Sequence, residues 1–334
     1  MSELENTPSG SAEESAVEMS LSKADQLAAD LRPWLNETPT LGVSALAERS
    51  MPASIVAKFE LWQRTGSFKA RGALANVKQL GYDAMRYGVT AVSAGNHAIA
   101  TAYAARELGT TAKVVMTASA SPIRVARCEA LGAEVVRAPT VHEAFAIAED
   151  IADSESRAFI HPFEGITTAL ATAGVGAELI RAIPDLDVVI VPVGGGGLAA
   201  GVSAAVKWLA PQCRVFGVEP VGADSMSRSI QAGSPQALTS VDTIADSLGA
   251  PMALPISFDL CRRHLDGIAV VNDDAIKHAM RRMHSILGLA VEPACAASLA
   301  ALETSLAGEV NGKRVGLIFC GSNIDATVWH QLVQ

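Results

Sequence analysis

The sequence predicts an α/β fold with a mostly parallel sheet. Short runs rich in β-branched residues alternate with longer runs of helical character, which is the pattern of strand–helix–strand units. The strand-like runs are apolar at consecutive positions, so we expect helices to cover both faces of the sheet. Hydrophobic residues make up 49% of the 334 residues and charged residues 18%, which allows a large buried core.

The expected strands occupy residues 55–61, 88–93, 112–116, 133–138, 188–193, 214–220, 267–271 and 314–319. The expected helices occupy residues 70–80, 97–108, 121–131, 142–152, 168–183, 198–209, 273–286 and 294–306. The helix at 97–108 ends beside Gly109, and glycine favours the backbone conformation that follows a helix. In parallel α/β sheets, ligands bind beyond the carboxyl ends of the strands. We therefore expect the chemistry in the strand-to-helix loops.

Composition and charge argue against two classes of partner. The net charge is −9 and no stripe of clustered lysine and arginine is present, which argues against nucleic acid. One uncharged run, 188–206, is long enough to resemble a membrane span. It contains Pro192 and four consecutive glycines, so two elements joined by a glycine loop explain it better. We expect neither nucleic acid nor a membrane as a partner.

The cysteines and the N-terminus indicate a reducing compartment. Five cysteines are scattered along the chain without a CxxC pair, as expected of reduced packing residues in a cytoplasmic protein. Residues 1–20 are acidic, rich in serine and without an apolar stretch. We expect them to form a disordered tail rather than a signal peptide.

Four loops combine polar residues with glycine where a helix is expected to begin. They are TGSFK at 65–69, SAGNH at 93–97, GGGGL at 194–198 and CGSN at 320–323. In the third loop, glycines let the backbone approach a ligand, and the N–H groups at the helix start attract an anion, most readily a phosphate. Two alternatives stay open for this loop alone. One is a dinucleotide site with Gly194, Gly196 and Glu219, and the other is tight helix–sheet packing.

The other three loops carry reactive or polar side chains. Lys69 is either a nucleophile toward an aldehyde or an ordinary solvated lysine. Ser93 and Asn96 could hold a carboxylate or a phenolic oxygen, or simply cap the next helix. His97 alone is better explained as a structural residue. Cys320 lies at the carboxyl end of the last strand, where it either faces the ligand or is a buried, inert cysteine.

Together the four loops fit one cofactor, pyridoxal phosphate. Its aldehyde needs a lysine, its phosphate needs an anion cradle, and its ring then accepts electrons in carbanion chemistry. A dinucleotide would leave Lys69 and the loops 93–97 and 320–323 unexplained. A nicotinamide-dependent oxidoreductase is therefore the alternative from a different class.

The chain resembles the fold-type II pyridoxal-phosphate enzymes, especially the group of serine/threonine dehydratases and serine racemases. The resemblance covers roughly residues 30–330, with TGSFKARGA, SAGNHAIA, PVGGGGLAAG, GVEP, TIAD, VEPA and CGSN in the order of the family. It implies two open, twisted, mostly parallel sheets flanked by helices, as in the tryptophan synthase β subunit. The cofactor would lie between a large domain, 21–80 and 167–334, and a small domain, 81–166, in a cytoplasmic homodimer.

The resemblance also implies roles for individual residues. Lys69 would form the internal Schiff base and act as the base at Cα. The cofactor would contact Phe68 beside the ring, Asn96 at the 3′ oxygen, Cys320 at the pyridine nitrogen, and Gly194, Gly195, Gly196, Gly197 and Leu198 around the phosphate. The substrate side would comprise Ser67 or Thr65, together with Ser93, Ala94, Gly95, Asn96 and His97.

The implied reaction removes the β-hydroxyl of L-threonine, L-serine or a related 3-hydroxy amino acid such as 3-hydroxyaspartate, giving a 2-oxo acid and ammonia. A neutral Cys320 makes the ring a weaker electron sink, which suits elimination better than transamination. Racemases of the group have serine at the position of Ala94, which has no proton to give, so serine racemase is the less favoured alternative. Arg124, Arg127 and Arg137 could reach an acidic substrate but are better explained as solvated surface residues.

A divalent-cation site, for example for Mg²⁺, is implied by Glu219 and the carbonyl group of Ala223. The family has an aspartate where this chain has Ser225, and Asp224 comes one residue early, which re-aims the carboxylate and puts the site in doubt. Ser247 replaces the glycine often found after TIAD, on the substrate side of the pocket. The chain ends soon after CGSN, so we expect no regulatory domain and no feedback by isoleucine.

Overall fold

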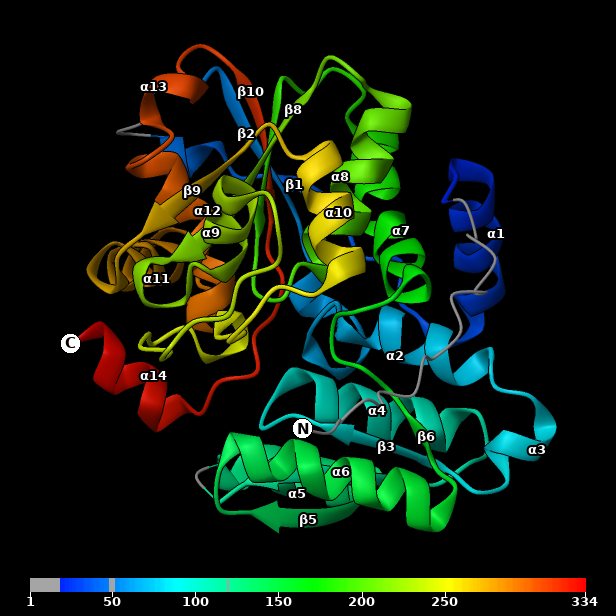
Figure 1. Cartoon of the computed structure of the whole chain (residues 1–334). Helices are drawn as coiled ribbons and strands as arrows, with labels where there is room; N and C mark the ends of the chain where they lie inside the picture. The colour runs from blue at the N-terminus through cyan, green and yellow to red at the C-terminus, as the bar shows by residue number, and fades with distance from the viewer. Residues whose placement is uncertain (1–18, 48–51, 119) are drawn as a thin grey trace, which may run out of the picture.

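The computed structural model describes residues 19–47, 52–118 and 120–334 (Figure 1). It contains two separate sheets, each flanked by helices. The acidic tail expected at 1–20 falls outside the described residues except for its last two positions. Among the helices described, none is both long and apolar enough to cross a membrane.

The larger sheet has six strands in the order β1–β2–β10–β7–β8–β9. All neighbouring pairs are parallel except β1 with β2. The strands are β1 (Thr40–Gly42), β2 (Ser54–Lys58), β7 (Val188–Pro192), β8 (Arg214–Pro220), β9 (Gly267–Val271) and β10 (Arg314–Ile318). The central strand β7 is buried at every position, as predicted for a sheet covered on both faces.

The smaller sheet has four parallel strands in the order β5–β4–β3–β6. They are β3 (Val89–Val92), β4 (Ala112–Thr117), β5 (Glu134–Ala138) and β6 (Ala158–Phe159). Helices α4 and α5 pack on one face and α6 packs on the other, so this sheet has a hydrophobic cluster on each side. The division into domains at residues 80 and 167 stays a prediction.

Helices cover the larger sheet on both sides (Figure 1). On one face α7 packs against α8, with α10 beside it, and on the other face α12 lies between the strands and α11. The helices are α1 (Leu21–Leu31), α2 (Lys69–Lys78), α3 (Tyr82–Met85), α4 (Asn96–Glu107), α5 (Pro122–Ala130), α6 (Val141–Glu155), α7 (Ile166–Ala182), α8 (Gly197–Leu209), α9 (Ser225–Ala232), α10 (Pro255–His264), α11 (Asp273–Leu287), α12 (Pro293–Glu303), α13 (Ala307–Val310) and α14 (Ala326–Val333).

Every predicted strand and helix overlaps an observed element, and most boundaries agree within two residues. The run 55–61 is wrong in its second half. Strand β2 ends at Lys58, and Glu60–Trp62 form a 3-10 helix, η3. In this turn the Glu60 side chain is buried and pairs with Arg71.

The four loops singled out in the sequence lie at the carboxyl ends of strands. Loops 93–97, 194–198 and 320–323 follow β3, β7 and β10. The loop 65–69 joins them because the N–H of Phe68 donates to the carbonyl oxygen of Cys320 at 3.1 Å, and Ser67 forms a β-bridge with Gly321. The fold therefore collects segments that are up to about 250 residues apart at one edge, as expected for ligand sites in α/β folds.

Candidate active site

Lys69 is the first residue of α2 and follows a tight turn. Thr65 and Gly66 have φ angles of +71° and +77°, which reverse the chain just before the helix. The side-chain Nζ of Lys69 donates to the carbonyl oxygen of Pro162 at 2.5 Å. Burial lowers the pKa of Lys69 to about 8, and the nearby Cys320 and Glu292 only partly offset this. About a tenth of the lysine is therefore neutral, and nucleophilic, at pH 7.

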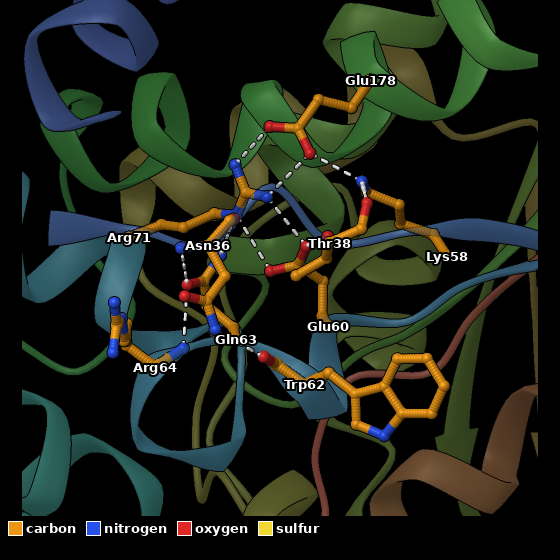
Figure 2. Close-up of polar contacts among 9 residues, drawn as sticks. All are labelled: Asn36, Thr38, Lys58, Glu60, Trp62, Gln63, Arg64, Arg71 and Glu178. Carbon is orange, nitrogen blue, oxygen red and sulfur yellow. Dashed lines mark hydrogen bonds and ion pairs between the residues drawn. The ribbon is translucent and has the colours of Figure 1, made fainter. Parts of the chain in front are cut away.

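A buried network of ion pairs fixes the beginning of α2 (Figure 2). Arg71, two residues after Lys69, donates to Glu60 from Nε at 2.9 Å and from Nη2 at 2.8 Å. It also donates to Glu178 of α7 from Nη1 at 2.7 Å, and Lys58 of β2 pairs with the same carboxylate at 2.6 Å. Because Lys58, Glu60 and Arg71 are almost fully buried, each depends on its partners to keep its charge. The network holds α2, and with it Lys69, against β2 and α7.

The glycine loop 194–198 connects β7 to α8. Gly196 is left-handed, with φ of +95°, and precedes the first residue of the helix. A Cβ atom on Gly195 would lie 2.3 Å from the ring of Phe163, and one on Gly197 would lie 2.4 Å from the carbonyl oxygen of Phe163. Close packing, one of the alternatives left open by the sequence, is thus one reason for glycine here. The unpaired N–H groups that begin a helix are a second.

Two adjoining cavities share Lys69, and we call them the inner and the outer cavity. The inner cavity, about 40 Å³, is lined among others by Phe68, Lys69, Asn96, Glu292, Cys320 and residues 194–198. The outer cavity, about 230 Å³, is lined among others by Lys69, Phe163, Ser247 and residues 93–97. The structure thus brings together the residues predicted for the cofactor and the substrate, except Ser67 and its alternative Thr65. Ser67 is fully buried against Gly321 and lines neither cavity.

Asn96 has protein partners at both ends of its amide. Its Nδ2 donates to both carboxylate oxygens of Glu292, at 2.8 and 3.0 Å, and its Oδ1 accepts from Asn323 Nδ2 at 2.6 Å. Nδ2 also makes a longer contact, donating to Ser247 Oγ at 3.4 Å. The contact of Asn96 with a cofactor oxygen stays a prediction.

Glu292 is the site residue that we did not identify from the sequence. It is 1% exposed, yet it lines the inner cavity. Burial raises the pKa of Glu292 to about 7, with a further contribution from Asp246. A Cβ on Gly321 would lie 2.3 Å from Glu292 Oε1, so that glycine makes room for the carboxyl group. The available signal was the segment VEPA, a glutamate within an apolar run directly before a proline that begins a helix.

Cys320 and His97 are uncharged near neutral pH. The thiol of Cys295 together with burial raises the pKa of Cys320 well above its ordinary value. Burial, followed by the charge of Lys69, lowers the pKa of His97 to about 3. The His97 Nε2 lies 2.8 Å from the carbonyl oxygen of Ile160, and since a carbonyl only accepts, Nε2 carries the hydrogen. This bond supports the structural role that the sequence favoured for the histidine taken alone.

Two hydroxyl groups lie close in sequence to Lys69 and have no hydrogen-bond partner in the described part of the chain. Thr65 Oγ1 and Ser67 Oγ are buried without a hydrogen bond to any described residue. Buried side-chain oxygens are nearly always paired, so both are exceptions, but neither residue lines the inner or the outer cavity. Ser93 differs, because its Oγ accepts from the N–H of Gly95 at 3.1 Å and so shapes the loop 93–97.

Arg124 and Arg127 are not the solvated surface residues that we expected. Arg124 donates to the carbonyl oxygen of Asn323 from Nη2 at 2.9 Å and pairs with Asp246, and its side chain is 12% exposed. Arg127 donates to the side chain of Asn323. Both tie α5 to the loop 320–323, and neither is among the described residues that line the outer cavity. Arg137 is exposed, as expected.

The residues considered for a divalent cation surround the beginning of α9. The Glu219 carboxylate accepts from the N–H groups of Met226 and Ser227, both at 2.8 Å, and burial raises the pKa of Glu219 to about 8. Asp224 pairs with Arg228 at 2.8 Å. The described residues contain no group of three or more His, Cys, Asp and Glu side chains placed to hold a metal. The cation site stays a prediction.

Comparison with known proteins decides the family. Residues 31–321 match the family model described as pyridoxal-phosphate dependent enzyme. The chain belongs to this family. Phenylserine dehydratase of Ralstonia pickettii is 49% identical to it over 310 residues, which cover 92% of this chain and 94% of the relative. L-threonine ammonia-lyase of Thermotoga maritima is 32% identical, with 88% of this chain and 73% of the relative covered.

A solved structure of the family has the same architecture. Maize serine racemase superposes with a TM-score of 0.86 at 30% identity, covering 93% of this chain and 96% of that chain. Family membership confirms the predicted fold class and pyridoxal phosphate as the cofactor. It also removes the nicotinamide-dependent alternative.

Proposed function

We propose that the chain is a pyridoxal-phosphate dependent dehydratase. It removes the β-hydroxyl group of a 3-hydroxy amino acid and releases a 2-oxo acid and ammonia. Water is lost in the elimination and regained in the hydrolysis that frees ammonia, so the atoms balance. The position of Lys69 carries the proposal, because this one amine faces both the inner cavity with the glycine loop and the outer cavity with the loop 93–97. The activities named for the two curated relatives support the same reaction class.

The residues of the inner cavity fit the cofactor of the family. When bound, pyridoxal phosphate supplies an aldehyde for an amine and a ring that takes up the electrons of a breaking Cα–H bond. We expect Lys69 to attach the aldehyde and the start of α8 to hold the phosphate, because residues 194–198 line the inner cavity where this helix begins. Phe68 would lie beside the ring. The neutral thiol of Cys320 would face the ring nitrogen.

Lys69 and Glu292 are the groups that would hold protons in the reaction. Lys69 Nζ, with a pKa of about 8, is suited to take the proton from Cα near neutral pH. Glu292, with a pKa of about 7, orients Asn96 and can accept or return a proton inside the cavity. We expect the substrate carboxylate to lie near the loop 93–97, which lines the outer cavity beside Lys69.

Ala94 favours elimination over racemisation. It lines the outer cavity, where a racemase of the group would present a serine hydroxyl as the second acid. A methyl group cannot donate a proton, so inversion at Cα lacks its second acid. Formation of D-serine from L-serine, measured beside 2-oxo acid release, separates the two activities, and the proposal requires the 2-oxo acid to dominate.

The experiment that tests the proposed function is a substrate series. Purified protein with added pyridoxal phosphate is incubated with L-serine, L-threonine, L-threo-3-phenylserine and 3-hydroxyaspartate. We expect a 2-oxo acid and ammonia in equal amounts from at least one of them. If all four remain unchanged while the cofactor is bound, the chain is not a dehydratase of this class.

We further propose a homodimer in the cytoplasm. Strand β1 forms one edge of the larger sheet, and its residue Leu41 is 43% exposed. Trp62, the last residue of the 3-10 helix η3 that follows β2, is 47% exposed. Apolar side chains of this size on a free sheet edge favour a protein partner. The five cysteines are buried and unpaired, which suits a reducing compartment. Sedimentation velocity tests the dimer, and a single species with the mass of one chain would contradict it.

A further inference from the structure

One side of the outer cavity is built from apolar side chains. We call these residues the apolar wall, and they are Val92, Val115, Phe145, Ala250 and Pro251. They line the same cavity as Lys69. Removal of a hydroxyl group from serine, whose β-carbon bears no further substituent, makes no use of such a wall.

The apolar wall is assembled from both halves of the molecule. Val92 and Val115 are register partners near the carboxyl ends of the neighbouring strands β3 and β4. Helix α6 covers that face of the sheet, and its residue Phe145 packs on the cluster that contains both valines. Ala250 and Pro251 come from the segment after η6 (Asp246–Leu248), and Ser247 within η6 contacts Glu292. The wall therefore stands next to the reactive groups and is continuous with the core of the smaller sheet.

The size of the outer cavity allows a large substituent. Its volume is about 230 Å³. An apolar cavity of about 150 Å³ is enough to enclose a benzene ring. A β-hydrogen or β-methyl group would leave most of this surface in contact with water.

The charges around the outer cavity do not suit an acidic substituent. The charged or titratable residues that line it are Lys69, His97 and Asp246. Lys69 is committed to the cofactor, His97 is neutral, and Asp246 would repel a carboxylate. The nearby guanidinium group of Arg124 is already paired with Asp246. A second carboxylate at Cβ, as in 3-hydroxyaspartate, would thus be desolvated without a partner.

We propose that the apolar wall receives an aryl group carried on Cβ of the substrate, and that Phe145 determines this specificity. The inference rests on the proposed dehydratase function and narrows its substrate class to 3-aryl-3-hydroxy amino acids. Adding or removing one methylene in a hydrophobic pocket changes specificity by about 10- to 200-fold. A phenyl ring in contact with the wall should therefore raise kcat/KM at least 100-fold over a methyl group.

The first test measures binding without turnover. L-Phenylalanine carries the aryl group but no β-hydroxyl group, and L-2-aminobutyrate carries a methyl group in its place. Calorimetric titration of the holoenzyme should show L-phenylalanine binding at least tenfold more tightly. Equal affinities would overturn the proposal, whether or not the chain proves to be a dehydratase.

The second test compares two variants of the same helix. Phe145→Ala should lower the ratio of kcat/KM for L-threo-3-phenylserine over L-threonine at least tenfold, and should remove the preference for L-phenylalanine. Ile147→Ala is the matched control, because Ile147 packs on the same cluster without lining the outer cavity. Ile147→Ala should leave the ratio of kcat/KM values and the preference for L-phenylalanine within about twofold of the wild type. Equal ratios in Phe145→Ala and the wild type would contradict the role of Phe145.

The outcomes separate this inference from the proposed function. If the wild type acts on L-serine or L-threonine and not on L-threo-3-phenylserine, the function stands and the apolar wall has another role. If Phe145→Ala does not fold, Phe145→Leu is measured instead, and it should lower the phenylserine ratio by a smaller factor. An unchanged ratio in that folded variant would also overturn the proposal.

Discussion

Asn96 and Glu292 meet through a two-centre contact, with Nδ2 of the amide 2.8 and 3.0 Å from the two carboxylate oxygens. Asn96 begins α4 beside the smaller sheet, and Glu292 precedes α12 on the larger one. Their contact therefore joins the two halves of the molecule inside the cavity that contains Lys69. A buried carboxyl group is costly to ionise, and the donors Asn96 and Ser247 only partly offset this cost, so burial raises the pKa of Glu292 to about 7.

Replacing Glu292 by glutamine should change how stability depends on pH. The pKa of Glu292 is higher in the folded chain than in the unfolded chain. Its contribution to the free energy of unfolding is therefore fully present below about pH 4.5 and is lost as pH rises through 7. The loss amounts to about 3 kcal/mol. Urea unfolding at pH 5, 6, 7 and 8 should show that the free energy of unfolding of Glu292→Gln increases relative to that of the wild type as pH rises. A constant difference between the two proteins would contradict the raised pKa.

Replacing Arg71 should destabilise the chain and weaken cofactor binding. Arg71→Ala leaves Glu60 buried without its partner, which costs roughly 3–5 kcal/mol. Arg71→Lys keeps the charge but loses the fork-shaped contacts to Glu60 and Glu178, so we expect an intermediate effect. Thermal unfolding measures the stability, and titration with pyridoxal phosphate measures the affinity.

Arg181→Ala is the control for that experiment. Arg181 pairs with Asp25 at 2.6 Å, but both side chains are largely exposed, at 50% and 40%. Exposed pairs contribute about 0–1 kcal/mol. If this variant lost as much stability as Arg71→Ala, the stabilisation by the network around α2 could not be attributed to its burial.

The rate of cofactor attachment should follow the ionisation of Lys69. Only the neutral amine attacks an aldehyde, and burial lowers the pKa of Lys69 to about 8. The rate should therefore rise about tenfold per pH unit below pH 7 and level off above pH 8. Stopped-flow absorbance after mixing cofactor-free protein with pyridoxal phosphate between pH 6 and 9.5 measures this rate. A rate still rising steeply at pH 9.5 would indicate an ordinary lysine.

Cys320 should tolerate a neutral substitution and not a charged one. Serine is neutral and smaller, so Cys320→Ser should retain activity within about fivefold. Cys320→Asp places a carboxyl group beside Cys295 and Glu292 in a buried site, which is unfavourable. It would also change the charge at the position that we propose for the contact with the ring nitrogen. We expect at least a 100-fold loss of 2-oxo acid release. Equal activities in the two variants would remove Cys320 from the proposed cofactor contacts.

Much of the fold could be predicted because its elements have strong local signals. Strands such as β7 are continuous apolar runs, and the loop 194–198 marks where α8 begins. Two of the strands that we did not predict have weak signals. Strands β1 and β6 have only three and two residues, so pairing with a neighbour rather than local sequence defines them.

The gathering of the loops at one edge could be predicted, but the contacts between their side chains could not. Arg71 looks like a solvated helix residue in the sequence, and its partners lie 11 and 107 positions away. Asn96 and Glu292 are 196 positions apart, and nothing local to either residue indicates the other. Arg124 and Arg127 were assigned to the surface because arginine is seldom buried, whereas Asn323 holds both in place. Such pairs depend on tertiary packing.

The most direct test of the central claim is to identify the residue that carries the cofactor. Protein loaded with pyridoxal phosphate is reduced with borohydride, digested and analysed by mass spectrometry, beside Lys69→Ala treated in the same way. We predict that the reduced cofactor is found on the peptide containing Lys69, and that the variant has neither this label nor the yellow colour. A label on another lysine, or the same colour and 2-oxo acid release from Lys69→Ala, would contradict the account.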